Sequence, residues 1–181
     1  MTTDVKITYS DYKDLDSDRQ YEVIGGRLIL SPAPRPSHQQ LVGQMFYFLT
    51  SYVKPRGLGR VLGAPCDIIL SEQDVVQPDV FFIATQRLKI IGEEGIHGGP
   101  DLCVEVLSPR TARRDREAKR KLYSLHGVRE YWIVDPDATR IEVYRLQADP
   151  AKPYALYGAG DTLTSSLWPD FTLPIDSVFV A

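Results

Sequence analysis

The chain has 181 residues, of which 43% are hydrophobic and 25% are charged, and its net charge is −3. This composition is typical of a globular domain and excludes a disordered chain, a collagen-like chain and a long coiled coil. The length predicts a single domain, residues 1–181, with one core. No apolar run reaches the ~20 residues of a membrane span, and the first residues lack the pattern of a secretory signal, so we expect a cytoplasmic protein without a membrane partner. Two cysteines, Cys66 and Cys103, are too few for a disulfide framework, and we expect both to be buried.

The first part of the chain predicts an arm, a hairpin and a helix. Residues 1–20 are polar and acidic and predict a short helix or a loosely held arm. Residues 21–30 predict a β-hairpin, because Gly25–Gly26 at its centre supplies the positive φ angles of a tight turn. Apolar residues at three- and four-residue steps over 38–53 predict a helix, with Ser37 as its N-cap.

The middle of the chain predicts the central strands. Strand-like runs cover 66–70, 75–76 and 79–84, and a polar, glycine-rich loop follows over 86–99. The clearest strand covers 101–107. Its alternation predicts one face made of Asp101, Cys103, Glu105 and Leu107, and an opposite face made of Leu102, Val104 and Val106.

The last part predicts one more helix and two more long strands. The helix begins at Ser108–Pro109, because proline is favoured in a first turn, and ends at Gly127, a C-terminal capping residue. Residues 130–134 and 140–146 predict strands joined by a turn, and residues 147–181 predict a C-terminal extension of loops and short strands. This order predicts an α/β (α+β) domain, with a mixed central β-sheet flanked by helices and an N-terminal β-hairpin.

Two carboxylates fall within apolar strands. Asp79 precedes the run 80–84, and Glu105 stands in the middle of 102–107. A buried carboxylate must be solvated, paired or bound to a cation, because an isolated buried charge costs several kcal/mol or more. Asp79 can also be a turn residue, and Glu105 an exposed edge residue or a salt-bridge partner. If the two strands are neighbours, the carboxylates can share one divalent ion, and their hard oxygen atoms suit Mg²⁺ or Mn²⁺.

The predicted helix after this strand carries a lysine on its apolar side. At 100° per residue, Asp115 and Lys119 fall near Tyr123 rather than on the charged face. Either they form an i,i+4 ion pair at the edge of the apolar stripe, or Lys119 points into a pocket beside the strand of Glu105. The same projection predicts an apolar side made of Ala112, Ala118, Leu122, Tyr123 and Leu125.

Basic residues are concentrated on the same helix. Residues 105–121 contain seven basic and three acidic residues, a net charge of +4, which leaves −7 for the rest of the chain. A basic segment in an acidic protein is either a phosphate-binding site or a solvated helix face. The charged face is expected to hold Arg113, Arg116, Glu117, Arg120 and Lys121, with Arg114 near its border.

Two further residues are candidates for a site. Glu22 is an acidic residue between Tyr21 and Val23 of the predicted hairpin. His38 opens the first long helix and can hydrogen-bond a phosphate or a water. Each of them can also be purely structural.

In this combination and order, the residues resemble the Uma-two family of bacterial restriction-endonuclease-like proteins, which has the PD-(D/E)XK nuclease fold. The resemblance covers about residues 20–145. Its matching stretches are 21–26, Ser31-Pro32 with His38 following, 77–80, 100–109, the four-residue steps Asp115, Lys119 and Tyr123, and 127–136.

The resemblance implies a metal-dependent endonuclease that hydrolyses phosphodiester bonds, with Mg²⁺ or Mn²⁺ as its cofactor. Asp79 matches the aspartate of the family's Pro-Asp motif and Glu105 the acidic residue of its second motif, so both are expected to hold the ion. Leu107 stands where the wider nuclease pattern has a lysine, and the resemblance implies that Lys119 supplies this lysine from the following helix. Glu22 is expected to orient a ligand or to bind a second ion.

The implied partner is nucleic acid, with DNA as the expected substrate. Analogy with nucleases that cut two strands predicts a homodimer. The alternative is a nucleic-acid-binding or interaction protein on the same fold, with catalysis weak or lost. The residues expected to contact nucleic acid are Arg113, Arg114, Arg116, Arg120 and His38.

Overall fold

The computed structural model describes residues 6–15 and 19–180. The predicted arm is therefore described only in part: helix α1 covers Tyr9–Lys13, and residues 1–5 and 16–18 lie outside the described residues. The other strands and helices are, in chain order, β1 (Tyr21–Ile24), β2 (Arg27–Leu30), α2 (Pro36–Val53), β3 (Gly59–Gly63), β4 (Ile68–Ser71), β5 (Asp74–Val76), β6 (Val80–Ala84), η1 (Thr85–Ile90), β7 (Ile96–His97), β8 (Leu102–Val106), α3 (Ala112–Arg114), η2 (Asp115–Lys119), α4 (Arg120–Leu125), β9 (Glu130–Asp135), β10 (Arg140–Arg145), β11 (Ala155–Tyr157), β12 (Thr162–Thr164), β13 (Thr172–Pro174) and η3 (Ile175–Ser177). No helix in the described part of the chain is both long and apolar enough to cross a membrane.

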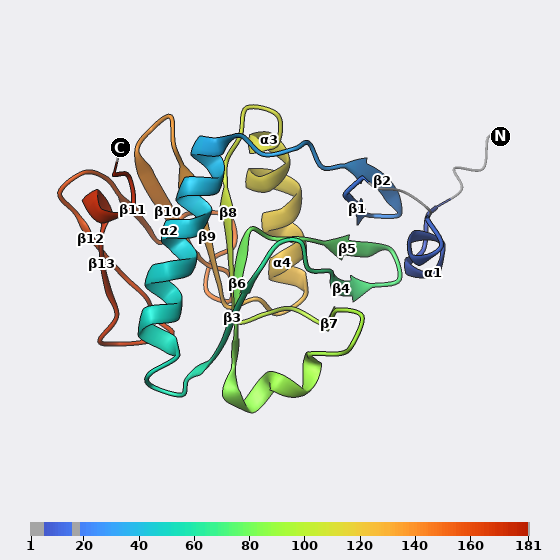
Figure 1. The fold of residues 1–181 in the computed structure, drawn as a ribbon, viewed down its shortest axis with the longest axis horizontal. Helices are drawn as coiled ribbons and strands as arrows, with labels where there is room; N and C mark the ends of the chain where they lie inside the picture. The colour runs from blue at the N-terminus through green and yellow to red at the C-terminus, as the bar shows by residue number, and fades with distance from the viewer. Residues whose placement is uncertain (1–5, 16–18, 181) are drawn as a thin grey trace.

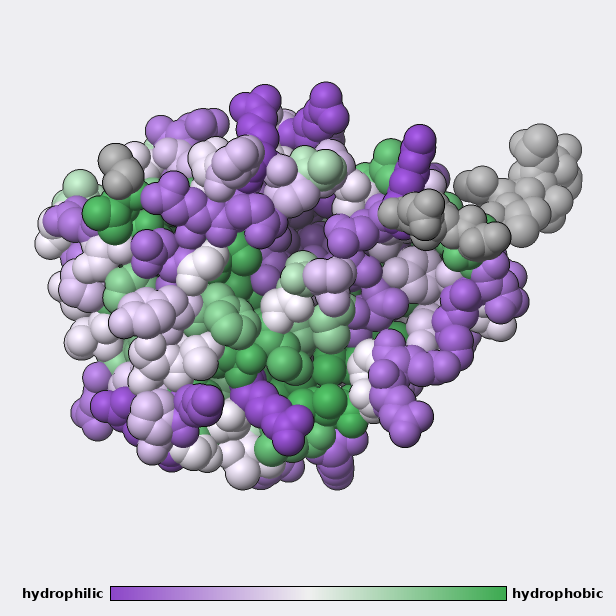
Figure 2. All heavy atoms as spheres, in the orientation of Figure 1, coloured by the Kyte–Doolittle hydropathy of each residue, from purple (hydrophilic) through white to green (hydrophobic). Residues whose placement is uncertain are grey.

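The predicted mixed central sheet is confirmed. Its strand order is β11-β10-β9-β8-β6-β3, with β8 and β9 parallel and the other neighbours antiparallel. Helix α2 covers one face of this sheet, and the helical segment from α3 to α4 covers the other (Figure 1). In the same view, hydrophilic side chains surround a middle zone of hydrophobic ones (Figure 2).

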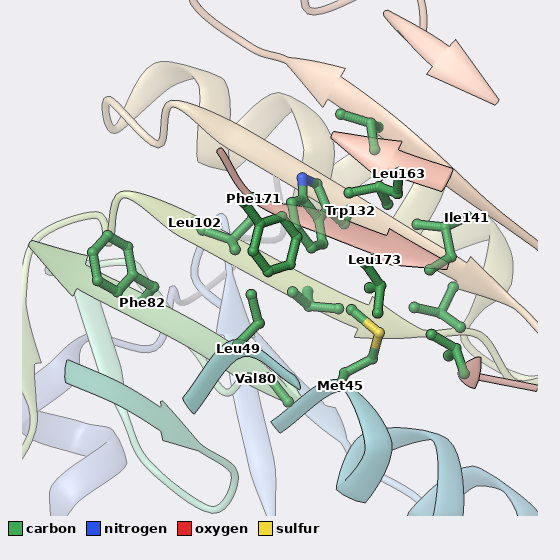
Figure 3. Close-up of a cluster of buried hydrophobic side chains, with 14 of the residues drawn as sticks. Met45, Leu49, Val80, Phe82, Leu102, Trp132, Ile141, Leu163, Phe171 and Leu173 are labelled. Atoms are coloured by element: carbon green, nitrogen blue, oxygen red, sulfur yellow. The ribbon is translucent and has the colours of Figure 1, made fainter. Parts of the chain in front are cut away.

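The alternation along β8 divides the core into two layers, as predicted. Leu102, Val104 and Val106 pack beneath α2. Figure 3 shows this layer, in which Met45 and Leu49 of α2 meet Trp132 of β9 and side chains of the C-terminal extension, such as Phe171. Cys103 and Leu107 pack on the opposite face with Tyr123 and Tyr131. Each fully buried aliphatic or aromatic side chain contributes about 1.5–3 kcal/mol, so the two layers fix β8 in the middle of the molecule.

A second, smaller sheet has the order β2-β1-β5-β4-β7. The predicted hairpin is confirmed as β1 and β2, with Tyr21 paired to Leu30 and Ile24 paired to Arg27. Gly25 has φ of 60° and Gly26 has φ of 76°, so the turn uses the left-handed region that glycine adopts without strain.

The helical segment after β8 differs from the prediction. It begins at Ala112 rather than at Ser108, and residues 115–119 form a π-helical turn between α3 and α4. Ala118 is exposed and Leu125 is 72% exposed, so neither belongs to the apolar side. The projection at 100° per residue fails here because a π-helical turn holds more residues than an α-helical turn and rotates the following side chains.

Three other elements depart from the prediction. Helix α2 begins at Pro36 with Arg35 as N-cap, so Ser37 is not the cap; the fixed φ of proline favours the first helical turn. Strand β3 (Gly59–Gly63) was not predicted, because it has glycine at both ends and only half-buried apolar residues, and it is defined by pairing with β6. The predicted loop 86–99 contains η1 and the short strand β7. Of the cysteines, Cys103 is buried as predicted and Cys66 is only half-buried.

Candidate active site

A cleft of about 590 Å³ opens between the start of α2, the hairpin and the ends of β6 and β8. The hollow near the top of Figure 2, beside the first turn of α2, marks its position. The sequence-predicted site residues that line it are Glu22, His38, Asp79, Glu105, Arg114 and Lys119, together with Asp115. The tertiary structure therefore brings together all four predicted catalytic residues, which come from four separate segments of the chain.

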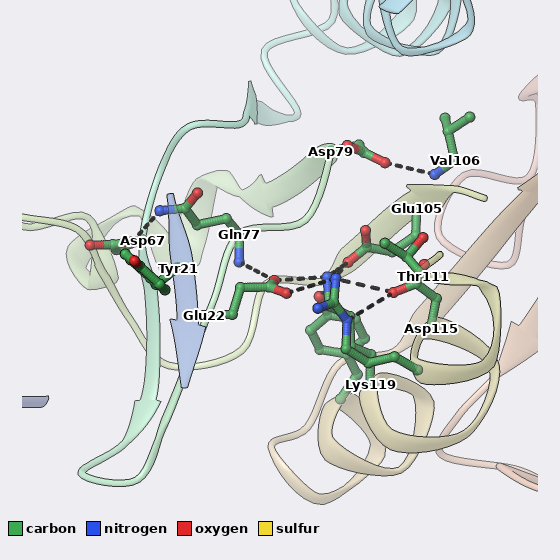
Figure 4. Close-up of polar contacts among 12 residues, drawn as sticks. Tyr21, Glu22, Asp67, Gln77, Asp79, Glu105, Val106, Thr111, Asp115 and Lys119 are labelled. Atoms are coloured by element: carbon green, nitrogen blue, oxygen red, sulfur yellow. Dashed lines mark hydrogen bonds and ion pairs between the residues drawn. The ribbon is translucent and has the colours of Figure 1, made fainter. Parts of the chain in front are cut away.

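Asp79 and Glu105 lie at the same end of neighbouring strands. Val80 of β6 pairs with Val104 of β8 in an antiparallel ladder. Asp79, one residue before Val80, and Glu105, one residue after Val104, therefore come to the same end of the strand pair. Asp79 Oδ2 accepts a hydrogen bond of 2.7 Å from the N–H of Val106, which ties the end of one strand to the other (Figure 4). The predicted adjacency of these two strands is confirmed.

Lys119 points inward, and its amine joins two carboxylates. Nζ lies 2.8 Å from Oε1 of Glu105 and 2.8 Å from Oε1 of Glu22, and all three side chains are at most 5% exposed. Asp115, one helical turn away, lies 3.8 Å from the same amine. Figure 4 shows the three acids converging on Lys119 from β1, β8 and the π-helical turn. Of the two interpretations of the sequence, the structure agrees with the one in which Lys119 points into a pocket.

Burial and charge act against each other in this cluster. Burial raises the pKa of Glu105 well above its usual range, although the Lys119 charge lowers it. Burial lowers the pKa of Lys119, but the charges of Glu105 and Glu22 outweigh it and hold the amine protonated. Burial also raises the pKa of Asp115, against smaller effects of Lys119 and Thr111. Three closely spaced carboxyl groups therefore surround the ammonium group of Lys119.

Arg114 supplies a second cation at the same place. Its guanidinium lies 3.2 Å from Oε2 of Glu22, and its Nε lies 3.8 Å from Oδ1 of Asp115. Neither of those two carboxylate oxygens has a hydrogen-bond partner in the described part of the chain, although both are buried. Four carboxylates, those of Glu22, Asp79, Glu105 and Asp115, thus face the two permanent cations Lys119 and Arg114.

This donor set fits a divalent cation. The four carboxylates of this cluster outnumber its two permanent cations, and carboxylate oxygens are the ligands that Mg²⁺ and Mn²⁺ prefer. The described side chains contain no ready-made group of three or more His, Cys, Asp or Glu arranged to hold a metal ion. Asp79 and Glu105, at the ends of neighbouring strands, are the two carboxylates that the sequence predicts as ligands, and metal binding by them stays a prediction.

His38 lies beside the ends of β6 and β8 where Asp79 and Glu105 stand. Its Nε2 is 3.0 Å from the carbonyl oxygen of Val106 and 3.4 Å from Oδ2 of Asp79. Burial lowers the pKa of His38, but the hydrogen bond and charge of Asp79 outweigh it, so the pKa lies above its ordinary value. The first turn of α2 thereby contacts both strands of the pair at the end where Asp79 and Glu105 lie.

The remaining predicted arginines do not form one face. Arg113 is exposed and, among the described residues, pairs only with Glu117, at 3.3 Å. Arg116 binds Asp135 at 2.7 Å and Glu142 at 2.6 Å, so acids of β9 and β10 compensate its charge. Arg120 donates to the carbonyl of Ala151 and stacks over the ring of Tyr144. Contact of these arginines with nucleic acid stays a prediction.

Two polar partners of the site had no role in the sequence interpretation. The hydroxyl of Tyr123 donates to Oε1 of Glu105 at 2.9 Å, and the backbone N–H of Gln77 donates to Oε1 of Glu22 at 2.9 Å. The four-residue step from Lys119 places Tyr123 on the same side of the helix, which is a signal in the sequence. The hydrogen bond from Gln77 to Glu22 joins residues 55 positions apart, so no local sequence pattern predicts it.

Comparisons with known proteins bear on the family and the fold of this chain. Residues 9–176 match the family Uma2, described as "Putative restriction endonuclease". No curated protein matches the chain. A solved structure, the "putative nuclease belonging to DUF820" from Anabaena variabilis ATCC 29413, superposes with a TM-score of 0.80 at 23% identity, over 96% of this chain and 97% of that chain. The structural likeness shows the shared fold, and because the family match spans most of the sequence, the chain belongs to the Uma2 family of restriction-endonuclease-like proteins.

Proposed function

We propose that this protein is a Mg²⁺-dependent endonuclease that hydrolyses phosphodiester bonds, with DNA as its substrate. The observation that carries the proposal is the meeting of Asp79, Glu105 and Lys119 in one cleft. The restriction-endonuclease family and the nuclease-like fold support the same reaction class.

Asp79 and Glu105 would hold the ion. When bound there, a divalent cation supplies charge that polarises a phosphate and makes a nearby water more acidic. The protein keeps both carboxylates in place: Val106 and His38 hold Asp79, and Tyr123 and Lys119 hold Glu105.

Lys119 is the group that meets developing negative charge on the phosphate. A preorganised cation in a buried site stabilises such charge more strongly than it would in water. Glu22 holds the amine from the other side, and Gln77 holds Glu22. Arg114 lines the same cleft and can bind a neighbouring phosphate of the nucleic-acid strand.

A second candidate function is nucleic-acid binding without turnover. The amine of Lys119 already lies 2.8 Å from two carboxylates, so its charge is compensated within the protein. If these pairs persist when substrate binds, the cleft holds a phosphate chain but lacks a free cation for catalysis.

A cleavage assay distinguishes the two functions. Supercoiled plasmid, single-stranded DNA and RNA are each incubated with the protein in Mg²⁺, in Mn²⁺ and in EDTA. We expect Asp79→Asn and Glu105→Gln to abolish cleavage, while the exposed Asp170→Asn, outside the cleft, serves as the matched control. Both test substitutions keep an acceptor oxygen for the hydrogen bonds described above, so they remove charge with little change in shape. Binding of DNA without cleavage by the parent protein would favour the second candidate.

A further inference from the structure

The N-terminal helix is connected to the candidate active site by a chain of hydrogen bonds. The hydroxyl of Tyr12 in α1 donates to Oδ1 of Asp67 at 2.9 Å. The side-chain amide of Gln77 donates to the same oxygen at 2.7 Å. The backbone N–H of Gln77 then donates to Glu22, which binds Lys119 (Figure 4 shows the part from Asp67 to Lys119).

Gln77 is the central residue of this chain, because it is held at both ends. Its side chain is fixed by Asp67 and its backbone by Glu22. It also stands two residues before Asp79, with only Pro78 between them. A rigid Gln77 therefore fixes two acids of the site at once, one by a hydrogen bond and one through the chain.

Helix α1 is itself firmly attached to the smaller sheet. The N–H of Ile7 donates to the carbonyl of Gly26, and the N–H of Tyr9 donates to the carbonyl of Glu72. A capping box between Thr8 and Asp11 closes the start of the helix. Tyr12 is thus presented to Asp67 by a segment that the body of the protein holds in one place.

We propose that Tyr12, Asp67 and Gln77 are positioning residues for the candidate active site, and that the segment 6–15 is therefore part of the catalytic unit. This inference rests on the proposed function. Groups that hold the ligands of a metal, without touching it, change metal affinity or activity by about 10–100-fold when they are removed. Gln77 occupies that place with respect to Glu22, and Asp67 acts one bond further out, through the side chain of Gln77.

The test compares three single variants. Gln77→Met removes the amide that binds Asp67 but keeps the backbone N–H that binds Glu22, and Tyr12→Phe removes only the hydroxyl. Tyr9→Phe is the matched control, because it removes a hydroxyl of the same helix that makes no hydrogen bond to Asp67 among the described residues. For Gln77→Met we expect kcat in the cleavage assay to fall about 10-fold, with KM little changed. We expect the Mn²⁺ affinity, measured by calorimetry, to fall by about the same factor. Tyr12→Phe should show a smaller loss in the same direction, and Tyr9→Phe none.

A double-mutant cycle makes the test independent of turnover. Tyr12→Phe and Glu22→Gln are combined, and urea unfolding is measured for the parent, both single variants and the double variant. Residues linked through one network show non-additive effects, whereas separate residues add. Additive unfolding effects, or unchanged kcat and Mn²⁺ affinity in Gln77→Met, overturn the inference. If the parent protein does not cleave nucleic acid, the proposed function fails, and the cycle alone decides whether α1 and the site are coupled.

Discussion

The amine of Lys119 lies 2.8 Å from Oε1 of Glu105, fourteen residues earlier in the chain, and both side chains are almost fully buried. A short connection that contains helix α3 joins the strand of Glu105 to the π-helical turn of Lys119 and places acid and base face to face. In the wider nuclease pattern the lysine stands two residues after the acid, where this chain has Leu107. Here Leu107 packs in the core layer with Tyr123, and the helix supplies the cation.

Removing this cation should be costly for folding. Lys119→Met leaves Glu22 and Glu105 buried without their shared partner, and breaking a buried ion pair in this way costs about 3–5 kcal/mol. We expect a loss of that order in the free energy of unfolding, measured with urea at pH 7. The exposed Lys121→Met is the control and should leave stability unchanged. Adding Glu22→Gln to Lys119→Met should recover part of the loss; no recovery would show that the pairing does not stabilise the fold.

A divalent cation should stabilise the folded protein. Because the acids of the site exist together only in the folded state, Mn²⁺ at about 100 times its Kd should add about 2.7 kcal/mol to the free energy of unfolding. We expect the melting temperature to rise with Mn²⁺ and to return with EDTA. Asp79→Asn should not respond, and Asp170→Asn should respond as the parent does. An equal rise in Asp79→Asn would place the ion elsewhere.

The arginines of the helical segment should separate into two classes. Arg113 has a side chain that is 90% exposed, so Arg113→Ala should leave stability unchanged. If it contacts a phosphate, the variant weakens DNA binding and lowers the salt slope by about one. Arg116→Ala removes the guanidinium bonds to Asp135 and Glu142, while Ala138, Arg140 and Tyr144 still donate to these carboxylates, so we expect a loss of about 1 kcal/mol. Filter binding at several salt concentrations and urea unfolding measure the two effects, and a stability loss in Arg113→Ala would contradict this division.

Asp135 should make the protein sensitive to acid. Burial raises the pKa of Asp135, but the N–H of Ala138 and the charge of Arg116 outweigh it, so the pKa lies below its ordinary value of 3.8. A folded-state pKa below the unfolded value means that the stabilisation is complete well above pH 4 and is lost as pH falls through the folded pKa. Asp135→Asn keeps an acceptor for Ala138 and should be less stable than the parent at pH 7. The difference in the free energy of unfolding between the parent and Asp135→Asn should disappear in acid. A constant difference from pH 7 to pH 2 would show that the charge of Asp135 does not stabilise the fold.

The sequence by itself determined the features that depend on neighbouring residues. The turn at Gly25–Gly26 follows from the φ angles that glycine allows. The two faces of β8 follow from the period of a strand, and they place Glu105 and Cys103 on one side. The spacing of Asp115 and Lys119 was enough to predict that both lie on the apolar side of the helix, since residues four apart share a face in an α-helix and nearly so in a π-helical turn. It left open whether the two pair at the edge of the apolar stripe or Lys119 points into a pocket.

Only the tertiary structure decided which distant groups meet. The sequence could propose Glu22 as an acid of the site, but its bonds to Gln77 and Lys119 require the hairpin, β6 and the helical segment to be packed together. The pairing of Arg116 with Asp135 and Glu142 likewise depends on strands that follow the helix. The spacing of apolar residues does not predict the π-helical turn. Strand β3 forms because it pairs with β6, and its own residues do not predict a strand. Local propensities act over a few residues, whereas these contacts are fixed by burial and charge between segments far apart in the chain.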